Sequence, residues 1–138
     1  MATKMKFHGM EEWSDNFPRV DFSTPKGIVD LHNNANFIEM DFHPSKSRII
    51  FKFKYASDWR LIEEQGIFVN LTFDGVHDLI IRQAPDFDPL AATTLESIVR
   101  DMQSEVSTFS VDLGDVLCFL SASSLTLTFS DTEGGATI

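Results

Sequence analysis

Cysteine is nearly absent from this sequence: Cys118 is the single cysteine among 138 residues. One thiol excludes an intramolecular disulfide. Proline and glycine are also scarce, with five and seven residues, and no internal repeat or low-complexity block divides the chain. The sequence therefore predicts one domain over residues 1–138, large enough to bury its own core, with residues 1–20 and 130–138 peripheral or flexible.

Long apolar runs and basic residues are missing as well. No segment approaches the length of a membrane span, and residues 1–10 lack the apolar run of a signal peptide, so we expect a cytoplasmic protein without a membrane partner. The 11 basic residues against 21 acidic ones give a formal net charge of −10, which argues against nucleic acid as a partner. An acidic surface would instead attract a basic protein, or would serve only to keep the chain soluble.

What the sequence does contain is alternation of apolar and polar residues, typical of strands with one buried face. Residues 36–55 predict a hairpin around a loop at 44–47, in which His43 faces Arg48. This register separates an apolar face from a charged face, so the pairing is well specified. The apolar face would consist of Ile38, Met40, Phe42, Ile49, Phe51 and Phe53.

The C-terminal part alternates in the same way. Residues 108–129 predict three antiparallel strands, joined by a two-residue turn at Gly114-Asp115 and by a loop at 121–124. All nine residues on one face of this arrangement are apolar, and Cys118 among them is expected to be a buried small residue. The nine are Phe109, Val111, Leu113, Val116, Cys118, Leu120, Leu125, Leu127 and Phe129.

Residues 69–81 predict a further hairpin. A three-residue loop at 73–75, with Gly75 in the left-handed conformation, aligns the apolar residues of its two strands. His77 would then lie on the core side of the strand and Asp78 on the opposite side, because successive side chains in a strand alternate.

Two segments are expected to be helical. Residues 58–66 predict one helical turn, and residues 93–103 have apolar residues at helical spacing, although the β-branched pair Ile98-Val99 would also suit a strand. Residues 27–31 predict a short strand. Together these elements predict a mainly β (β-rich α+β) protein, an antiparallel β-sandwich or flattened barrel of about seven to eight strands with one short helix.

Few residues suggest chemistry. His77 and Asp78, with His43 as a distant third member, could form a catalytic or metal-binding group, but the chain lacks the spaced motifs that such groups use. The triplet Asp-Phe-Asp at 86–88 resembles the start of a calcium loop, and the residues after it lack the third ligand and the glycine. The sequence therefore predicts no catalytic residue, no metal and no cofactor.

Several aromatic residues lie outside the alternating segments, where they could anchor an interface. With two acidic neighbours they form the candidate partner-binding set, or else they cover open sheet edges and the ends of the core. The set is Trp13, Phe17, Trp59, Asp86, Phe87 and Asp88.

The region around Gly75 resembles the immunity-protein-50-like domains of bacterial polymorphic toxin systems, in which a strand, an LTF-x-GV-x-x-L pattern and a second strand follow one another. The resemblance covers residues 28–129, and the matching residues are Leu31, His32, Asn33, Leu71, Thr72, Phe73, Gly75, Val76 and Leu79. It implies a bacterial protein that binds and neutralises a toxin and has no catalytic residues.

The sequence thus favours a non-enzymatic cytoplasmic protein that binds a partner protein, with a basic toxin as one form of that partner. The alternative is a β-sandwich or barrel that binds a small ligand between its sheets or in its mouth. An enzyme is the least supported class, since no catalytic motif is present. Strand order and oligomeric state stay open.

Overall fold

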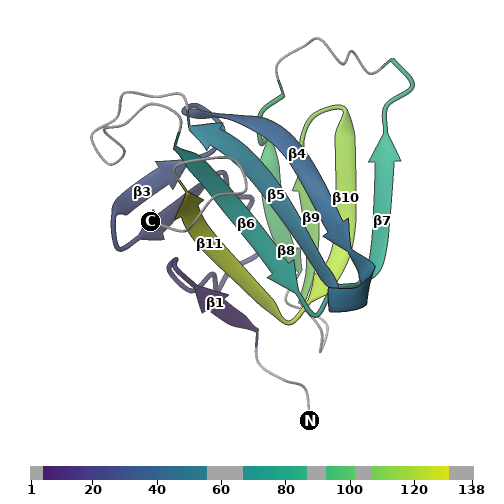
Figure 1. Cartoon of the computed structure of the whole chain (residues 1–138), viewed down its shortest axis with the longest axis horizontal. Helices are drawn as coiled ribbons and strands as arrows, with labels where there is room; N and C mark the ends of the chain where they lie inside the picture. The colour runs from purple at the N-terminus through teal and green to yellow at the C-terminus, as the bar shows by residue number, and fades with distance from the viewer. Residues whose placement is uncertain (1–4, 56–66, 87–92, 102–106, 131–138) are drawn as a thin grey trace.

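The computed structural model describes residues 5–55, 67–86, 93–101 and 107–130, which form two β-sheets packed face to face (Figure 1). The five-stranded sheet has the order β1 (Lys6–His8), β11 (Ser124–Ser130), β6 (Phe68–Asp74), β5 (Arg48–Tyr55), β4 (Ala35–His43). The four-stranded sheet has the order β7 (His77–Gln83), β10 (Val116–Ala122), β9 (Ser107–Asp112), β8 (Ser97–Asp101). A separate hairpin pairs β2 (Asp21–Thr24) with β3 (Gly27–Asp30).

The predicted mainly β sandwich is therefore confirmed. The described residues contain eleven strands instead of seven or eight, and the hydrogen bonds among these strands keep the two sheets separate instead of closing them into a flattened barrel. A short 3-10 turn, η1 (Pro44–Lys46), joins β4 to β5.

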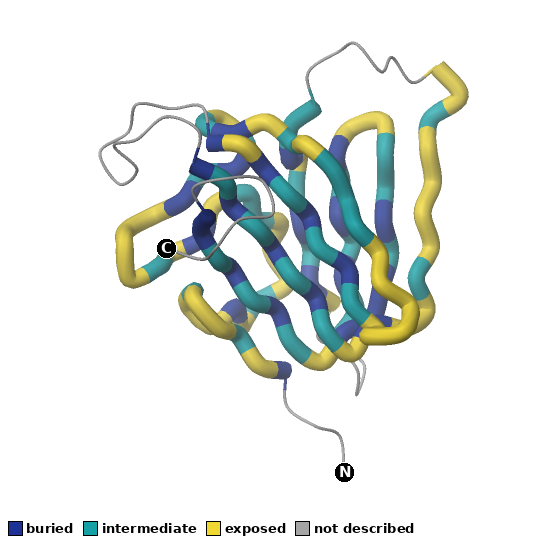
Figure 2. Tube along the Cα trace, in the orientation of Figure 1, coloured by how far each residue is buried: buried dark blue, intermediate teal, exposed yellow. Residues whose placement is uncertain are grey.

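The core is built from the inward-facing residues of both sheets. Buried and less buried residues alternate along β5 and β6, as their sequence predicts (Figure 2). Phe73 of β6 links the layers, because its ring packs edge to face on Phe51 of its own sheet and on Phe109 of the opposite sheet, with centroids 5.8 and 5.0 Å away. The predicted burial of Cys118 is confirmed, and its Sγ lies 3.5 Å from the Met40 Sδ across the core.

β4 and β5 form the first predicted hairpin. The predicted register is confirmed from the loop back to the pair Glu39 and Lys52. A bulge then shifts the pairing by one residue, so that Phe37 opposes Phe53 and Ile38 is 39% exposed. Placing Ile38 in the core was wrong, because the inserted residue reverses the alternation of side chains. Placing Phe42 there was wrong as well, since it is 45% exposed near the end of β4.

Two connections that the sequence predicts as hairpins lead instead from one sheet to the other. β6 pairs with β5 and β11, so both of its edges are occupied, and the chain turns at Gly75 into β7 of the opposite sheet. β10 likewise pairs with β7 and β9, and the chain turns at Ser123 into β11. The predicted hairpin at 69–81 and the third strand of the meander at 108–129 are therefore wrong as pairings. The predicted apolar faces of β6, β10 and β11 still enter the core, whereas no residue of β7 is buried and Ile81 is 47% exposed.

The two sheet-switching corners lie against each other. The Ser123 N–H of one corner donates to the Asp74 carbonyl of the other at 2.9 Å. The Val76 N–H donates at 2.8 Å to the carbonyl of Ser47, which follows η1 in the connection between β4 and β5. Gly75 has a φ of +69°, as its predicted left-handed conformation requires, and a Cβ there would lie 2.1 Å from the Ser123 Oγ. Glycine is needed at this corner for both reasons.

The segment expected to be helical at 93–103 contains strand β8. Ile98 is fully buried and pairs with Val111 of β9. The helix prediction is wrong for the described part of this segment, because the β-branched Ile98 and Val99 extend the four-stranded sheet at its edge.

Two other predicted elements are confirmed, and one lies outside the described residues. The strand at 27–31 is found as β3, and the Gly114-Asp115 turn is closed by a hydrogen bond from the Leu113 N–H to the Val116 carbonyl. The helical turn predicted at 58–66 falls outside the described residues. In the parts of the chain that are described, no helix has the length and apolar character to cross a membrane.

The described residues among the first twenty, predicted from their polarity to be peripheral or flexible, are tied to the sandwich at three points. β1 pairs in parallel with β11, which sets Phe7 beside Leu125. Trp13 is fully buried, and Arg19 exchanges two main-chain hydrogen bonds with Ile98 at 2.9 and 2.8 Å. β1, Trp13 and Arg19 thus connect this segment to both sheets.

Candidate functional site: the Phe17 loop

Residues 13–19, here termed the Phe17 loop, lie between β1 and β2 and are anchored by Trp13. The Trp13 side chain is fully buried and packs edge to face on Phe22 of β2 and Phe109 of β9, with ring centroids 6.1 and 5.9 Å away. Trp13 therefore covers the core, which is the alternative role that the sequence allowed for these aromatics.

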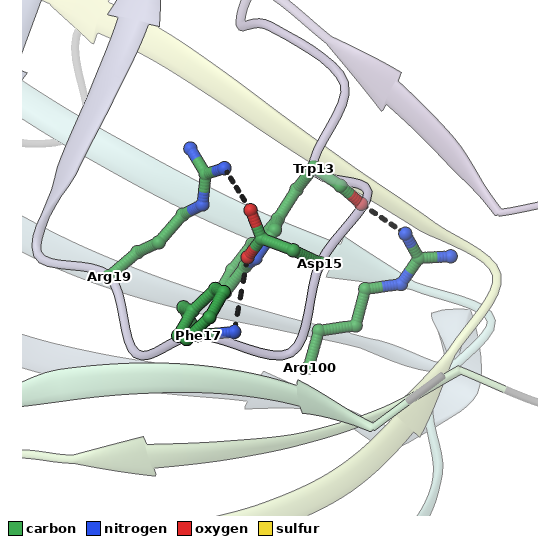
Figure 3. A network of polar contacts seen from close by, with 5 residues as sticks. All are labelled: Trp13, Asp15, Phe17, Arg19 and Arg100. Carbon is green, nitrogen blue, oxygen red and sulfur yellow. Dashed lines mark hydrogen bonds and ion pairs between the residues drawn. The ribbon is translucent and has the colours of Figure 1, made fainter. Parts of the chain in front are cut away.

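Asp15 fixes the turn that follows the anchor (Figure 3). One carboxylate oxygen accepts a hydrogen bond from the Phe17 N–H at 3.1 Å, and the other accepts one from the Arg19 guanidinium at 3.0 Å. Desolvation works to raise the pKa of Asp15, but the hydrogen bonds from Arg19 and the Phe17 amide outweigh it and hold that pKa below its ordinary value. The carboxylate is therefore ionised, and the turn braced, at neutral pH.

Two guanidinium groups hold Trp13 from either side. The Arg19 guanidinium carbon lies 5.5 Å from the centroid of the Trp13 ring. Arg100, a buried residue of β8, donates to the Trp13 carbonyl and to the Ser107 Oγ, the latter at 3.1 Å (Figure 3). Burial lowers the pKa of Arg100. The loop is thus tied to the sandwich through its ring, its carbonyl and its aspartate.

Phe17 is presented to solvent by this braced loop. Its side chain is 75% exposed, the largest exposure among the exposed large apolar residues in the described part of the chain. Its neighbours in the sequence, Asn16 and Pro18, are exposed as well, and so are the acidic residues Glu11 and Asp21 on either side of the loop. The result is an exposed aromatic ring on a braced loop, with an exposed acidic residue on either side of the loop in the sequence.

The remaining predicted partner-binding residues fall elsewhere. Asp86 is exposed in the segment that follows β7. Trp59, Phe87 and Asp88 lie outside the described residues. The structure thus brings together Trp13 and Phe17, of which Phe17 is the exposed member.

His77 and Asp78 form an exposed pair at the start of β7. Their Nε2 and Oδ2 atoms are 4.0 Å apart, and their side chains are 53% and 84% exposed. The prediction that they point to opposite faces is wrong, because Asp78 has a φ of +55° and interrupts the alternation. His43 is exposed at the end of β4. Across the described residues, no group of three or more His, Cys, Asp or Glu side chains is placed to hold a metal ion.

A surface hollow of about 290 Å³ lies beside β1. Its volume is just below the range of small-molecule sites, roughly 300–1,000 Å³. The residues that line it are Met5, Lys6, Phe7, His8 and Glu12.

Sequence reasoning missed the residues that brace the Phe17 loop. Asp15 stands two residues before Phe17, the spacing at which an aspartate side chain accepts from the main chain of a turn. Arg100 is two residues after the buried Ile98, so it shares the inward face of β8. That signal becomes visible only when residues 97–101 are taken as a strand.

The residues that carry the family resemblance mostly build the fold. Leu71 and Phe73 are fully buried, and Gly75 makes the corner after β6. The Asp30 carboxylate accepts hydrogen bonds from the main-chain N–H groups of His32 and Asn33, both at 2.9 Å, and so forms a turn after β3. Comparison of the chain with protein families, curated proteins and solved structures found no match.

Proposed function

We propose that this protein is a non-enzymatic cytoplasmic domain that binds another protein through the Phe17 loop. The observation that carries the proposal is a ring 75% exposed on a loop that Asp15 and Trp13 hold in place. Binding energy at interfaces concentrates in a few anchors, enriched in aromatic side chains, and an anchor that is already ordered loses less entropy on binding.

The setting of the loop supports a basic partner. Glu11 and Asp21 are exposed and stand close to Phe17 in the sequence, and the chain carries a formal net charge of −10. Charge of one sign speeds encounter with a partner of the other sign and penalises wrong partners. In its most specific form the proposal is that of an immunity-type protein that covers a basic face of a bacterial toxin, and the resemblance over residues 71–79 supports this form.

The test begins with capture of partners from the native cell lysate and continues with the purified partner. Phe17→Ala should weaken binding of that partner roughly 30-fold, the effect of losing a hot spot of ~2 kcal/mol, while the free energy of unfolding stays unchanged. Ile28→Ala is the matched control, because Ile28 is also exposed, at 52%, on the separate β2–β3 hairpin. Added salt should slow association.

Two results would count against the proposal. A partner that binds Phe17→Ala as tightly as the unaltered protein would exclude the Phe17 loop as the interface. For the toxin form, expression of the partner alone should arrest growth and co-expression with this protein should restore it. Growth restored equally by Phe17→Ala would contradict that form.

The small-ligand alternative has one observation in its favour, the hollow beside β1. It places Lys6, His8 and Glu12 around about 290 Å³, enough for a small polar molecule. A thermal-shift screen of small metabolites tests it: a ligand that stabilises the protein, and no longer does so after Lys6→Ala, would favour this function over protein binding.

A further inference from the structure

The hollow beside β1 has side chains of both charge signs on its walls. Lys6 and His8 stand two residues apart on β1, so their side chains leave the same face of the strand, roughly 6.6 Å apart. Glu12 supplies an acidic wall, and Met5 and Phe7 supply apolar surface. A molecule with a carboxylate and an ammonium close together would find a partner for each charge. The walls therefore fit a small zwitterion of the amino-acid class.

The three polar residues of the hollow are open to a ligand. Lys6, His8 and Glu12 are all exposed. A carboxylate offers about four lone-pair sites, so Glu12 can accept from a ligand ammonium beside the interactions that it already makes. The volume of about 290 Å³ lies just below that of sites for drug-sized molecules, which suits a ligand as small as an amino acid.

Two residues that line the hollow also interact with Arg100 of β8. The Arg100 guanidinium carbon lies 5.2 Å from the centroid of the Phe7 ring. Burial lowers the pKa of Arg100, and the negative charge of Glu12 acts in the opposite direction. Glu12 therefore helps to keep a buried guanidinium charged.

Arg100 in turn holds the Phe17 loop. It donates to the Trp13 carbonyl, and Figure 3 shows this bond beside the turn that Asp15 braces. The Arg100 Nε has no hydrogen-bond partner among the described residues, so the guanidinium depends on few contacts. One side chain thus connects the hollow to the Phe17 loop, and packed side chains of this kind can carry coupling between two sites.

We propose that the hollow is a regulatory site: a small zwitterion bound there weakens partner binding at the Phe17 loop through Arg100. The ligand ammonium offsets the charge of Glu12, so Arg100 loses part of the negative charge that compensates its burial and holds the Trp13 carbonyl less firmly. Phe17 is then less well ordered before binding, which costs the partner affinity. The regulatory part rests on the proposed function, whereas occupation of the hollow does not.

Titration calorimetry of the full chain with the standard amino acids tests occupation of the hollow. At least one should bind, and its N-acetyl derivative and its amide, which lack the ammonium and the carboxylate respectively, should bind about tenfold more weakly. Lys6→Ala and Glu12→Gln should each weaken binding about tenfold as well. Lys46→Ala is the matched control, because Lys46 is an exposed lysine of η1, on the other side of the five-stranded sheet.

Nuclear magnetic resonance tests the link to the loop without any partner. The bound amino acid should shift the amide signal of Phe17, whose N–H donates to Asp15. In Arg100→Met, which should stay folded, the amino acid should still bind and the shift of Phe17 should be lost. With the purified partner, saturating amino acid should raise the partner's dissociation constant about fivefold or more, and the partner should weaken amino-acid binding by the same factor, because coupling is reciprocal.

Three results overturn the proposal: no amino acid binds with a dissociation constant of about 1 mM or less, the bound amino acid leaves the Phe17 signal unchanged, or it leaves partner binding as tight as before. The second result is the one expected of a protein that only binds a small ligand. Failure of the proposed function is distinguishable, because the amino acid would then shift the Phe17 signal while no protein binds the loop.

Discussion

Replacement of Trp13 by alanine should be among the most damaging single changes in this protein. The ring is fully buried between Phe22 and Phe109. A tryptophan buries about 150–250 Å², and at ~25 cal/mol per Å² this gives about 4–6 kcal/mol as an upper bound. Truncation of buried Phe or Trp to alanine costs about 3–5 kcal/mol. A 138-residue domain has a stability of roughly 7–20 kcal/mol, so a loss of about 3–5 kcal/mol for Trp13→Ala is roughly 15–70% of the total.

Urea unfolding followed by far-ultraviolet circular dichroism measures this loss without depending on tryptophan fluorescence. Trp13→Phe should cost only about 1–2 kcal/mol, because an aromatic ring still fills the site. Phe17→Ala is the control from the same loop and should stay within about 0.5 kcal/mol, since that side chain is exposed. A loss below about 1 kcal/mol for Trp13→Ala would refute the docking of the Phe17 loop on the core.

Three further predictions concern the corners, the buried thiol and the buried guanidinium. Gly75→Ala should lower the free energy of unfolding by about 1–2 kcal/mol because of its left-handed backbone, and further because the new Cβ would contact the Ser123 Oγ. Adding Ser123→Gly to the same chain should recover the part of the loss that comes from this contact. If the losses of the two single variants, measured by urea unfolding, simply sum in the double variant, the two corners do not touch. Burial raises the pKa of Cys118 from 9.0 to about 11, so its thiolate at pH 8 is about 100-fold rarer than usual and a thiol reagent should act only as fast as the protein opens. Because the folded protein holds the Cys118 thiol proton more tightly than the unfolded chain does, the stability gained from this proton is present below pH 9 and is lost as the pH rises through 11. The Cys118→Ala variant should therefore lose less stability between pH 9 and 11 than the unaltered protein. An equal loss would contradict the raised pKa of Cys118. Arg100→Met leaves the Trp13 carbonyl without its donor and should cost about 1.5–3 kcal/mol in urea unfolding, whereas an unchanged midpoint would mean that the bond contributes nothing.

Local patterns predicted faces better than pairings. The alternation in residues 108–129 identified which side chains enter the core, since this depends only on the period of the strand. It did not predict that β10 and β11 belong to different sheets, because side chains from two facing sheets point into the same core and leave the same pattern in the sequence. The helix predicted at 93–103 failed for a related reason: spacing at Ile98 and Val99 suits both structures, and a neighbouring strand decides between them.

In the candidate site, too, local sequence patterns predicted part of the arrangement and tertiary contacts decided the rest. The sequence marked Trp13 and Phe17 as aromatics outside the alternating strands, and could not separate the buried one from the exposed one. That separation depends on Phe22, Phe109 and Arg100, which contact the Phe17 loop from β2, β9 and β8. Burial is a property of what covers a residue, and for Trp13 most of that cover comes from distant parts of the chain.

The sequence by itself determined the fold class, the first hairpin from its loop back to Glu39, the left-handed Gly75 and the buried Cys118, because each follows from short-range periodicity or local backbone preference. Only the tertiary structure decided that β6 and β10 have both edges occupied, so that the chain must switch sheets beside each of them. It also decided that β7 keeps one edge without a described partner. Which strands pair with each other depends on the packing of the whole sandwich, whereas which face of a strand is apolar depends on its own residues.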